Sequence, residues 1–134
     1  LATWDKNQFV TIIGRKDDMI ISSGENIYPT EVEAVLNTHA KVKDCIVTSV
    51  PDKIRGQIVT AYIVPVASIE EAEHGLAEEL DEFCKESNEI ANFKRPRYYR
   101  FVSQIPFNAT GKKLHVKIKE IASRDQKNGL LYRV

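Results

Sequence analysis

The sequence is poor in cysteine, which could cross-link the fold through disulfides or bind a metal, and in tryptophan and methionine. It contains two cysteines, one tryptophan and one methionine among 134 residues. Cys45 and Cys84 lie in apolar-patterned segments and lack C-x-x-C spacing. Two reduced core thiols are therefore a better interpretation than a disulfide, a zinc site or a nucleophile. Reduced thiols favour a cytoplasmic location.

Long apolar runs and an excess of either charge are also missing. No run approaches the length of a membrane span, and the first ten residues lack the hydrophobic region of a signal peptide. Lys plus Arg number 19 and Asp plus Glu number 19, so net charge does not draw the chain to nucleic acid or to an acidic membrane. A chain of this length buries about two-thirds of its unfolded surface, which suffices for a core without disulfides or metal.

The apolar patterning predicts an α+β domain, with a small mixed sheet flanked by helices. Strands are expected at residues 8–13, 19–22, 45–50, 58–66 and 98–102, and helices after Thr30, over 69–87 and over 114–122. We expect residues 1–16 to form a short N-terminal β-hairpin that belongs to something larger.

Two capping boxes are expected at the helix starts. Thr30 with Glu33 is predicted to cap the first helix, and Ser68 with Glu71 the second. Gly75 should weaken the second helix without interrupting its apolar stripe.

Charge is distributed unevenly along the chain. Residues 70–89 contain nine acidic residues and one basic residue, whereas residues 93–119 contain eight basic residues and no acidic one. The basic part interleaves cations with aromatic rings: Phe93, Lys94, Arg95, Arg97, Tyr98 and Tyr99. Guanidinium groups for phosphate beside flat rings for a base indicate a site for a nucleotide-bearing ligand. The alternative is a solvated acidic helix face beside a basic surface.

The three histidines do not indicate a metal site. His39, His74 and His115 share no spacing typical of metal ligands. We expect them to be surface residues, and we expect no metal bound by this chain's own side chains.

Two motifs carry more information than the patterning. The first is GRKDDMIISSGENIYPTEVE at residues 14–33, and the second is PFNATGKKL at residues 106–114. In this order, with a strand pair and a helix between them, they resemble the signature segments of the C-terminal domain of adenylate-forming enzymes. That superfamily comprises acyl- and aryl-CoA synthetases, non-ribosomal peptide adenylation domains and firefly luciferase. The resemblance covers nearly the whole chain.

The first motif resembles the family pattern G-R-x-D-x-x-I-K-x-x-G-x-x-I-x-x-x-E-I-E, with Ile21 where lysine is common. The resemblance implies that Asp17 is the hinge about which the small domain swings on a large one. It implies that Arg15 approaches the nucleotide from the hinge side. It places Gly24 in the loop that lines the tunnel for the pantetheine arm of coenzyme A. The alternatives are an ordinary hairpin turn at Asp17 and a glycine that merely permits positive φ at Gly24.

The second motif resembles P-x-T-x-S-G-K-I-x-R, with His115 where arginine often closes the pattern. The resemblance implies that Lys112 is the catalytic lysine, which bridges the substrate carboxylate and the α-phosphate of ATP during the first half-reaction. A long, flexible cation suits a place where two anions are forced together. The alternatives are a solvated loop lysine and the neighbouring Lys113.

The stretch FKRPR at residues 93–97 resembles the family motif F-K-x-P. In CoA ligases this motif helps to hold the nucleotide end of coenzyme A. The resemblance implies that Phe93 stacks on adenine while Arg95 and Arg97 reach phosphates. The alternative is that Phe93 belongs to the core and the arginines are solvated.

Together the motifs imply the C-terminal domain of an ATP-dependent acyl- or aryl-CoA ligase. Residues 1–16 would end the large N-terminal domain, and residues 17–134 would form the mobile domain. Coenzyme A and a small carboxylic acid are the implied ligands, with ATP and Mg²⁺ bound mainly by the large domain. The implied protein partner is that large domain, and the chain alone is expected to be inactive.

Two alternatives remain open at this point. An adenylation domain that loads a carrier protein would share the motifs but would not need the nucleotide-end contacts. A nucleic-acid-binding module would use the basic, aromatic segment 93–119. The zero net charge and the absence of an RNP-like motif argue against nucleic acid.

Overall fold

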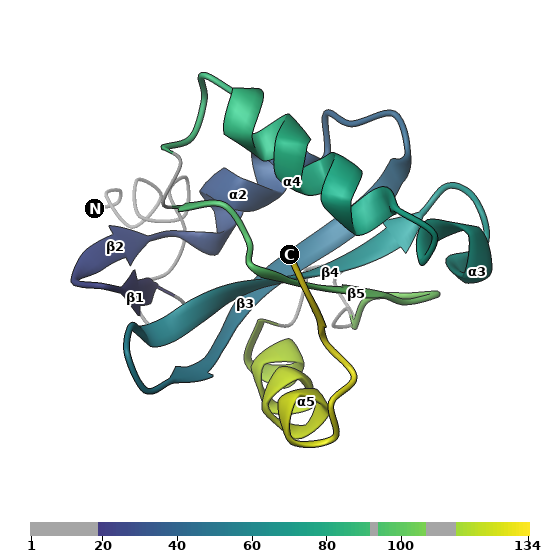
Figure 1. Ribbon diagram of the computed structural model, residues 1–134. Helices are drawn as coiled ribbons and strands as arrows, with labels where there is room; N and C mark the ends of the chain where they lie inside the picture. The colour runs from purple at the N-terminus through teal and green to yellow at the C-terminus, as the bar shows by residue number, and fades with distance from the viewer. Residues whose placement is uncertain (1–18, 92–93, 107–114) are drawn as a thin grey trace, which may run out of the picture.

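The computed structural model describes residues 19–91, 94–106 and 115–134 (Figure 1). Its elements in chain order are β1 (Ile20–Ser22), β2 (Glu25–Ile27), α2 (Pro29–Leu36), β3 (Val42–Asp52), β4 (Gly56–Pro65), α3 (Ile69–Ala72), α4 (Leu76–Glu86), β5 (Tyr98–Phe101), α5 (His115–Lys127) and β6 (Tyr132–Arg133). The strand expected at 8–13, the turn around Asp17 and the boundary at residue 16 lie outside the described residues.

The main sheet has the strand order β3-β4-β5-β6. β3 and β4 form an antiparallel hairpin, β5 pairs parallel to β4, and β6 pairs antiparallel to β5. A separate two-stranded hairpin joins β1 to β2. The fold is therefore α+β with a mixed sheet, as the sequence predicts. The hairpin that the structure describes lies within residues 20–27.

Helices cover both faces of the sheet. Figure 1 shows α2 and α4 on one face and α5 on the other. Along β3, Cys45 and Val47 belong to the core under α2 and α4, whereas Ile46 and Val50 belong to the core over α5. Successive side chains of a β-strand point to opposite faces of the sheet, so they enter the two cores alternately. Because both faces are covered, the middle of β3 is continuously buried.

The first helix begins earlier than the sequence pattern predicts. Tyr28 is the N-cap of α2, Pro29 is its first helical residue, and Glu31 Oε2 accepts a hydrogen bond from Tyr28 N at 3.1 Å. Proline suits this position because it has no N–H to satisfy and its φ is already helical. The capping box expected from Thr30 and Glu33 is therefore wrong, and the Glu33 side chain instead bonds Val47 N.

The long acidic helix is divided. Ser68 caps α3 and its Oγ accepts a hydrogen bond from Glu71 N at 3.2 Å, which is the Ser68 half of the predicted capping box. The continuous helix over 69–87 is wrong, because Gly75 has φ +114° and separates α3 from α4. The apolar stripe nevertheless survives the break, since Ala72 and Leu76 both lie in the core.

Both cysteines are free and buried, as expected. Burial raises the pKa of the Cys84 thiol to about 11, which keeps it protonated and unreactive at neutral pH. Among the described residues, no helix combines the length and apolarity that a bilayer crossing requires.

One buried polar network ties α5 to the sheet. Asp125 Oδ2 accepts a hydrogen bond from the Tyr62 hydroxyl at 2.5 Å and pairs with Arg100 Nη1 at 2.9 Å. Burial and the hydrogen bond to Asp125 raise the pKa of Tyr62 well above its usual value. Charge-assisted bonds of this kind are stronger than neutral ones.

We predict that Asp125→Ala lowers the free energy of unfolding by about 3 kcal/mol, because it leaves a buried hydroxyl and a guanidinium without their acceptor. Tyr62→Phe, which keeps the Asp125–Arg100 pair, should cost about 1 kcal/mol. Urea unfolding followed by circular dichroism measures both values. Equal losses for the two variants would contradict an anchoring role for the carboxylate.

Candidate functional site

Two of the predicted site residues, Gly24 and Arg97, lie toward one end of the sheet. β3 and β4 are joined by the turn 53–55, and this end of the sheet is called the hairpin end here. Because β5 runs parallel to β4, Arg97, which directly precedes β5, lies toward the hairpin end. Its backbone N donates to Val59 O at 2.9 Å, and its backbone O accepts from Val134 N at 3.0 Å.

The turn that contains Gly24 docks on the same end. Ser23 N donates to Arg55 O at 2.9 Å, and Ile21 N donates to the Gln57 side chain at 2.7 Å. Ser23 and Gly24 have φ of 53° and 82°, and they form the two-residue loop between β1 and β2. Two positive φ values characterise the type I′ turn, which favours glycine at its second position. A Cβ added to Gly24 would meet no atom within 4 Å among the described residues.

Lys94 and Arg95 are held by acidic partners on two helices. Arg95 Nε bonds Asp81 Oδ1 of α4 at 2.8 Å, and both side chains are nearly buried. Lys94 Nζ pairs with Glu31 Oε1 of α2 at 2.9 Å. These two cations therefore fasten the chain before β5 to the helical layer.

Arg97 differs from Arg95 in its environment. Its Nε is buried and has no hydrogen-bond partner among the described residues. Burial lowers the pKa of Arg97, and repulsion from Arg95 and Arg55 lowers it further. The carboxylate of Asp81 acts in the opposite direction. A buried guanidinium N–H close to other cations is an arrangement that an anion stabilises. The structure therefore makes Arg97 the strongest candidate for a phosphate ligand among the described residues.

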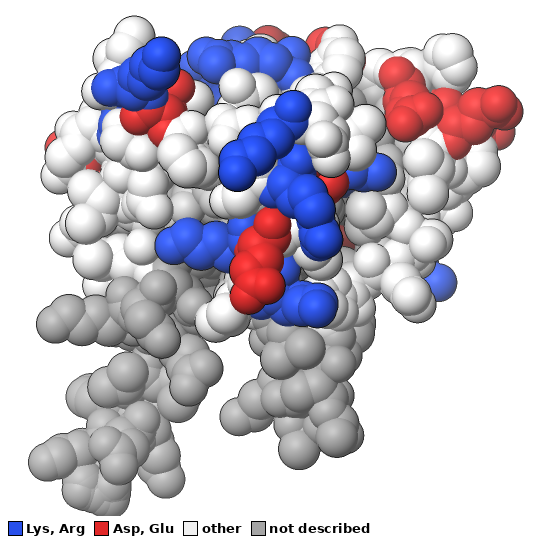
Figure 2. Space-filling view, turned by 90° about the horizontal axis from the view of Figure 1, so that it is seen from below, with Lys and Arg blue, Asp and Glu red and all other residues white. Residues whose placement is uncertain are grey.

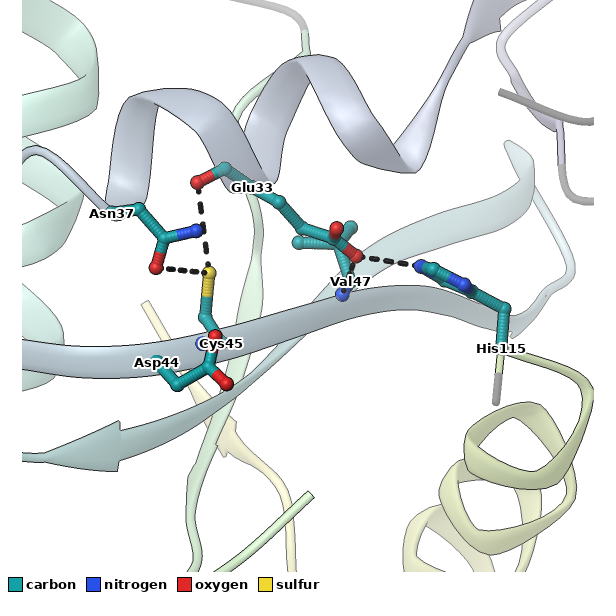
Figure 3. A network of polar contacts seen from close by, with 6 residues as sticks. All are labelled: Glu33, Asn37, Asp44, Cys45, Val47 and His115. Atoms are coloured by element: carbon teal, nitrogen blue, oxygen red, sulfur yellow. Dashed lines mark hydrogen bonds and ion pairs between the residues drawn. The ribbon is translucent and has the colours of Figure 1, made fainter. Parts of the chain in front are cut away.

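A second polar cluster lies at the edge of the sheet (Figure 3). Glu33 Oε2 accepts a hydrogen bond from Val47 N at 2.8 Å and lies 2.7 Å from His115 Nε2. The His115 side chain is 17% exposed and that of Glu33 is 8% exposed. His39 is similarly enclosed, since its side chain is 10% exposed and contacts Glu79. The expectation of surface histidines is thus wrong for these two and correct for His74.

The surface around α5 carries both signs of charge. Lys117, Lys119, Arg124 and Lys127 are exposed on this helix, together with Glu120. Figure 2, which views the molecule from the α5 side, shows basic side chains with acidic groups among them. A uniform basic stripe, which non-specific nucleic-acid binding requires, is not present over the described part of this face.

The arrangement is that of an α+β domain with a candidate anion site toward one end of its sheet, and comparison identifies its family. The model of the AMP-binding enzyme C-terminal domain matches residues 31–112, and the chain belongs to this family.

The relatives are CoA ligases. The chain is 42% identical over 118 residues to 2-succinylbenzoate–CoA ligase of Bacillus licheniformis, covering 88% of this chain and 23% of that protein. It is 38% identical over 124 residues to the mitochondrial medium-chain acyl-CoA ligase ACSF2 of Homo sapiens, covering 92% of this chain and 19% of the relative. The chain thus spans about a fifth of these relatives' length.

Solved structures agree with this assignment. The o-succinylbenzoate CoA synthetase of Bacillus subtilis, in complex with its acyl-adenylate intermediate, matches with a TM-score of 0.69 and 37% identity, covering 80% of this chain and 20% of that one. A fatty acyl CoA synthetase of Mycobacterium tuberculosis matches with a TM-score of 0.72 and 35% identity, covering 84% of this chain and 21% of that one.

The predicted site residues divide into two groups. Gly24, Arg95 and Arg97 are described, and Gly24 and Arg97 both lie at the hairpin end. The others lie outside the described residues: Arg15, Asp17, Phe93 and Lys112. Sequence reasoning missed the contact between Glu33 and His115. The departure of His115 from the usual arginine was its only signal.

We predict that Gly24→Ala lowers the free energy of unfolding by about 1 kcal/mol, because alanine is strained at positive φ. Gly24→Asn should be close to neutral, since asparagine tolerates this turn position. Thermal unfolding of the two variants checks the difference. Equal destabilisation by alanine and asparagine would show that the space around Gly24, and not its φ, sets the cost.

Proposed function

We propose that this chain is the mobile C-terminal domain of an ATP-dependent acyl- or aryl-CoA ligase. Residues 1–16 end the large N-terminal domain, and residues 17–134 form the mobile domain. In the first half-reaction a carboxylate oxygen attacks the α-phosphorus of ATP and displaces pyrophosphate. In the second, the thiol of coenzyme A attacks the acyl carbonyl and displaces AMP. The buried Nε of Arg97, which has no hydrogen-bond partner among the described residues, carries this proposal, because it supplies a phosphate-binding donor where the resemblance requires one.

In the first half-reaction Lys112 is the catalytic residue. Its ammonium group bridges the attacking carboxylate and the α-phosphate and offsets their mutual repulsion. Arg15 approaches the nucleotide, and Asp17 is the hinge at which the domain turns between the half-reactions. ATP and Mg²⁺ are held mainly by the large domain. The described residues contain no group of three or more His, Cys, Asp or Glu side chains that could hold a metal ion.

In the second half-reaction the hairpin end receives coenzyme A. Arg97 binds a phosphate of the nucleotide end, and Phe93 stacks on the adenine. Gly24 borders the path of the pantetheine arm, where a side chain would narrow the passage. Arg95 contributes mainly by holding this segment on α4, because its guanidinium is engaged by Asp81. The two free, buried cysteines fit a reducing compartment such as the cytoplasm.

We predict that Lys112→Ala in the full-length enzyme slows acyl-adenylate formation by at least about a hundredfold, because the cation between two anions is lost. Transfer of the acyl group from a preformed adenylate to coenzyme A should be unchanged. Pyrophosphate exchange measures the first step, and thioester formation from synthetic acyl-adenylate measures the second. Lys113→Ala is the matched control and should preserve both rates. An equal loss in both half-reactions would refute the assigned role.

We predict that Arg97→Ala raises the KM for coenzyme A about ten- to a hundredfold, the worth of one charge-assisted hydrogen bond. Its KM for pantetheine, which lacks the nucleotide, should equal that of the unaltered enzyme. Arg95→Ala should instead lower the thermal stability, because it leaves the carboxylate of Asp81 short of a partner in a nearly buried site. Steady-state kinetics with both thiols and thermal unfolding check these outcomes.

The same experiment tests the alternative acceptor. An adenylation domain that loads a carrier protein would show no change in its thioester formation on replacement of Arg97. The CoA-ligase names of the relatives favour coenzyme A.

A further inference from the structure

A buried carboxylate joins three elements around the β3 edge of the described sheet. β3 is an edge strand, and Val47 N points away from β4 toward Glu33 of α2. The same carboxylate oxygen contacts His115, the first residue of α5. Because α2 and α5 cover opposite faces of the sheet, this contact links the two helical layers across the edge strand (Figure 3).

The position of this carboxylate is fixed from both sides. Its hydrogen bond to a strand amide is charge-assisted, and losing it would leave a nearly buried acceptor and donor unsatisfied. One turn further along the helix, the Cys45 thiol lies 3.7 Å from Glu33 O and 3.5 Å from Asn37 Oδ1, which ties the same helix to the same strand. The helix around Glu33 is therefore tied to β3 at two points, and His115 contacts this helix through Glu33.

His115 and the lysine of the second motif, Lys112, are close together along the covalent chain. His115 follows Lys112 by three residues. Because a residue spans at most about 3.6 Å, the Cα atom of Lys112 lies within roughly 11 Å of that of His115. His115 is therefore the described residue nearest to Lys112 along the chain, and orientation of a reacting group has a large effect on rate.

We propose that Glu33 and His115 are positioning residues for adenylate formation, acting by fixing the point from which the Lys112 segment departs. The inference rests on the proposed function, since it assumes that Lys112 acts in the first half-reaction. Neither side chain touches the reacting atoms. Their effect is confined to the half-reaction that uses Lys112.

The structure offers a control pair of the same chemistry. His39 Nε2 lies 3.1 Å from Glu79 Oε2, and this contact joins the chain after α2 to α4. The His39 ring also packs edge-on against the Phe83 ring, so this pair contributes to stability. Neither His39 nor Glu79 lies close to Lys112 along the sequence. Loss of this pair reports what a stability defect alone does to the two half-reactions.

The test compares two replacements of His115 in the full-length enzyme. His115→Phe keeps a ring of similar shape but removes the contact with Glu33. His115→Gln places an amide N–H near the original Nε2 position and can restore the contact. Acyl-adenylate formation, thioester formation from preformed adenylate and thermal unfolding are measured for each. His39→Phe serves as the control variant.

We expect His115→Phe to slow adenylate formation about ten- to a hundredfold while leaving thioester formation within about twofold. His115→Gln should recover most of the lost rate. His39→Phe should lower stability without changing the ratio of the two half-reaction rates. The inference is overturned if His115→Phe slows both steps equally, if it slows neither, or if His39→Phe shifts the ratio as much.

The Lys112→Ala variant separates this inference from the function on which it rests. If Lys112→Ala leaves adenylate formation intact, the proposed function itself fails. If Lys112→Ala abolishes adenylate formation while His115→Phe does not slow it, the function stands and the positioning role is wrong.

Discussion

The parallel pairing of β4 with β5 is the constraint on which the candidate site depends. Parallel neighbours start at the same end of a sheet, so the segment before β5 arrives beside the β3–β4 turn although some forty residues separate them. The intervening α3 and α4 are the crossover that this pairing requires. That crossover also supplies Asp81, which holds Arg95 and leaves Arg97 over the hairpin end. The candidate anion site thus depends on topology as much as on the local motif.

Arg95 and Arg97 show why composition identifies a site more readily than a role. From the sequence alone, these two arginines, two residues apart, are equally good candidates for binding phosphate. The fold gives one a carboxylate partner and leaves the Nε of the other buried without a partner among the described residues. The difference lies in which acidic residue α4 presents, and no local pattern encodes this. The energetic consequences differ, since removing Arg95 leaves Asp81 with Lys85 as its remaining cation, whereas removing Arg97 relieves repulsion between cations.

The sequence predicts much of the fold, and its errors have physical causes. Strands with apolar runs and the Ser68 cap were predictable, because period and capping chemistry are local. The first helix start was misplaced because Pro29 fits its N1 position better than Thr30 fits an N-cap. β6 has two residues and exists only because β5 offers an edge. The partner of His115 was out of reach because 82 residues separate it from Glu33.

Glu33 illustrates how a motif residue acquires a second use once its predicted local role fails. A glutamate that capped its own helix would use its carboxylate to accept hydrogen bonds from backbone N–H groups of that helix. Since Glu31 takes the capping role, Glu33 is available to satisfy the outward amide of an edge strand and to hold His115. An unpaired edge amide is a liability, so one carboxylate both protects the sheet edge and connects the helices on its two faces. Within the proposed two-step reaction, the edge of β3 and the hairpin end then serve different half-reactions on one rigid sheet.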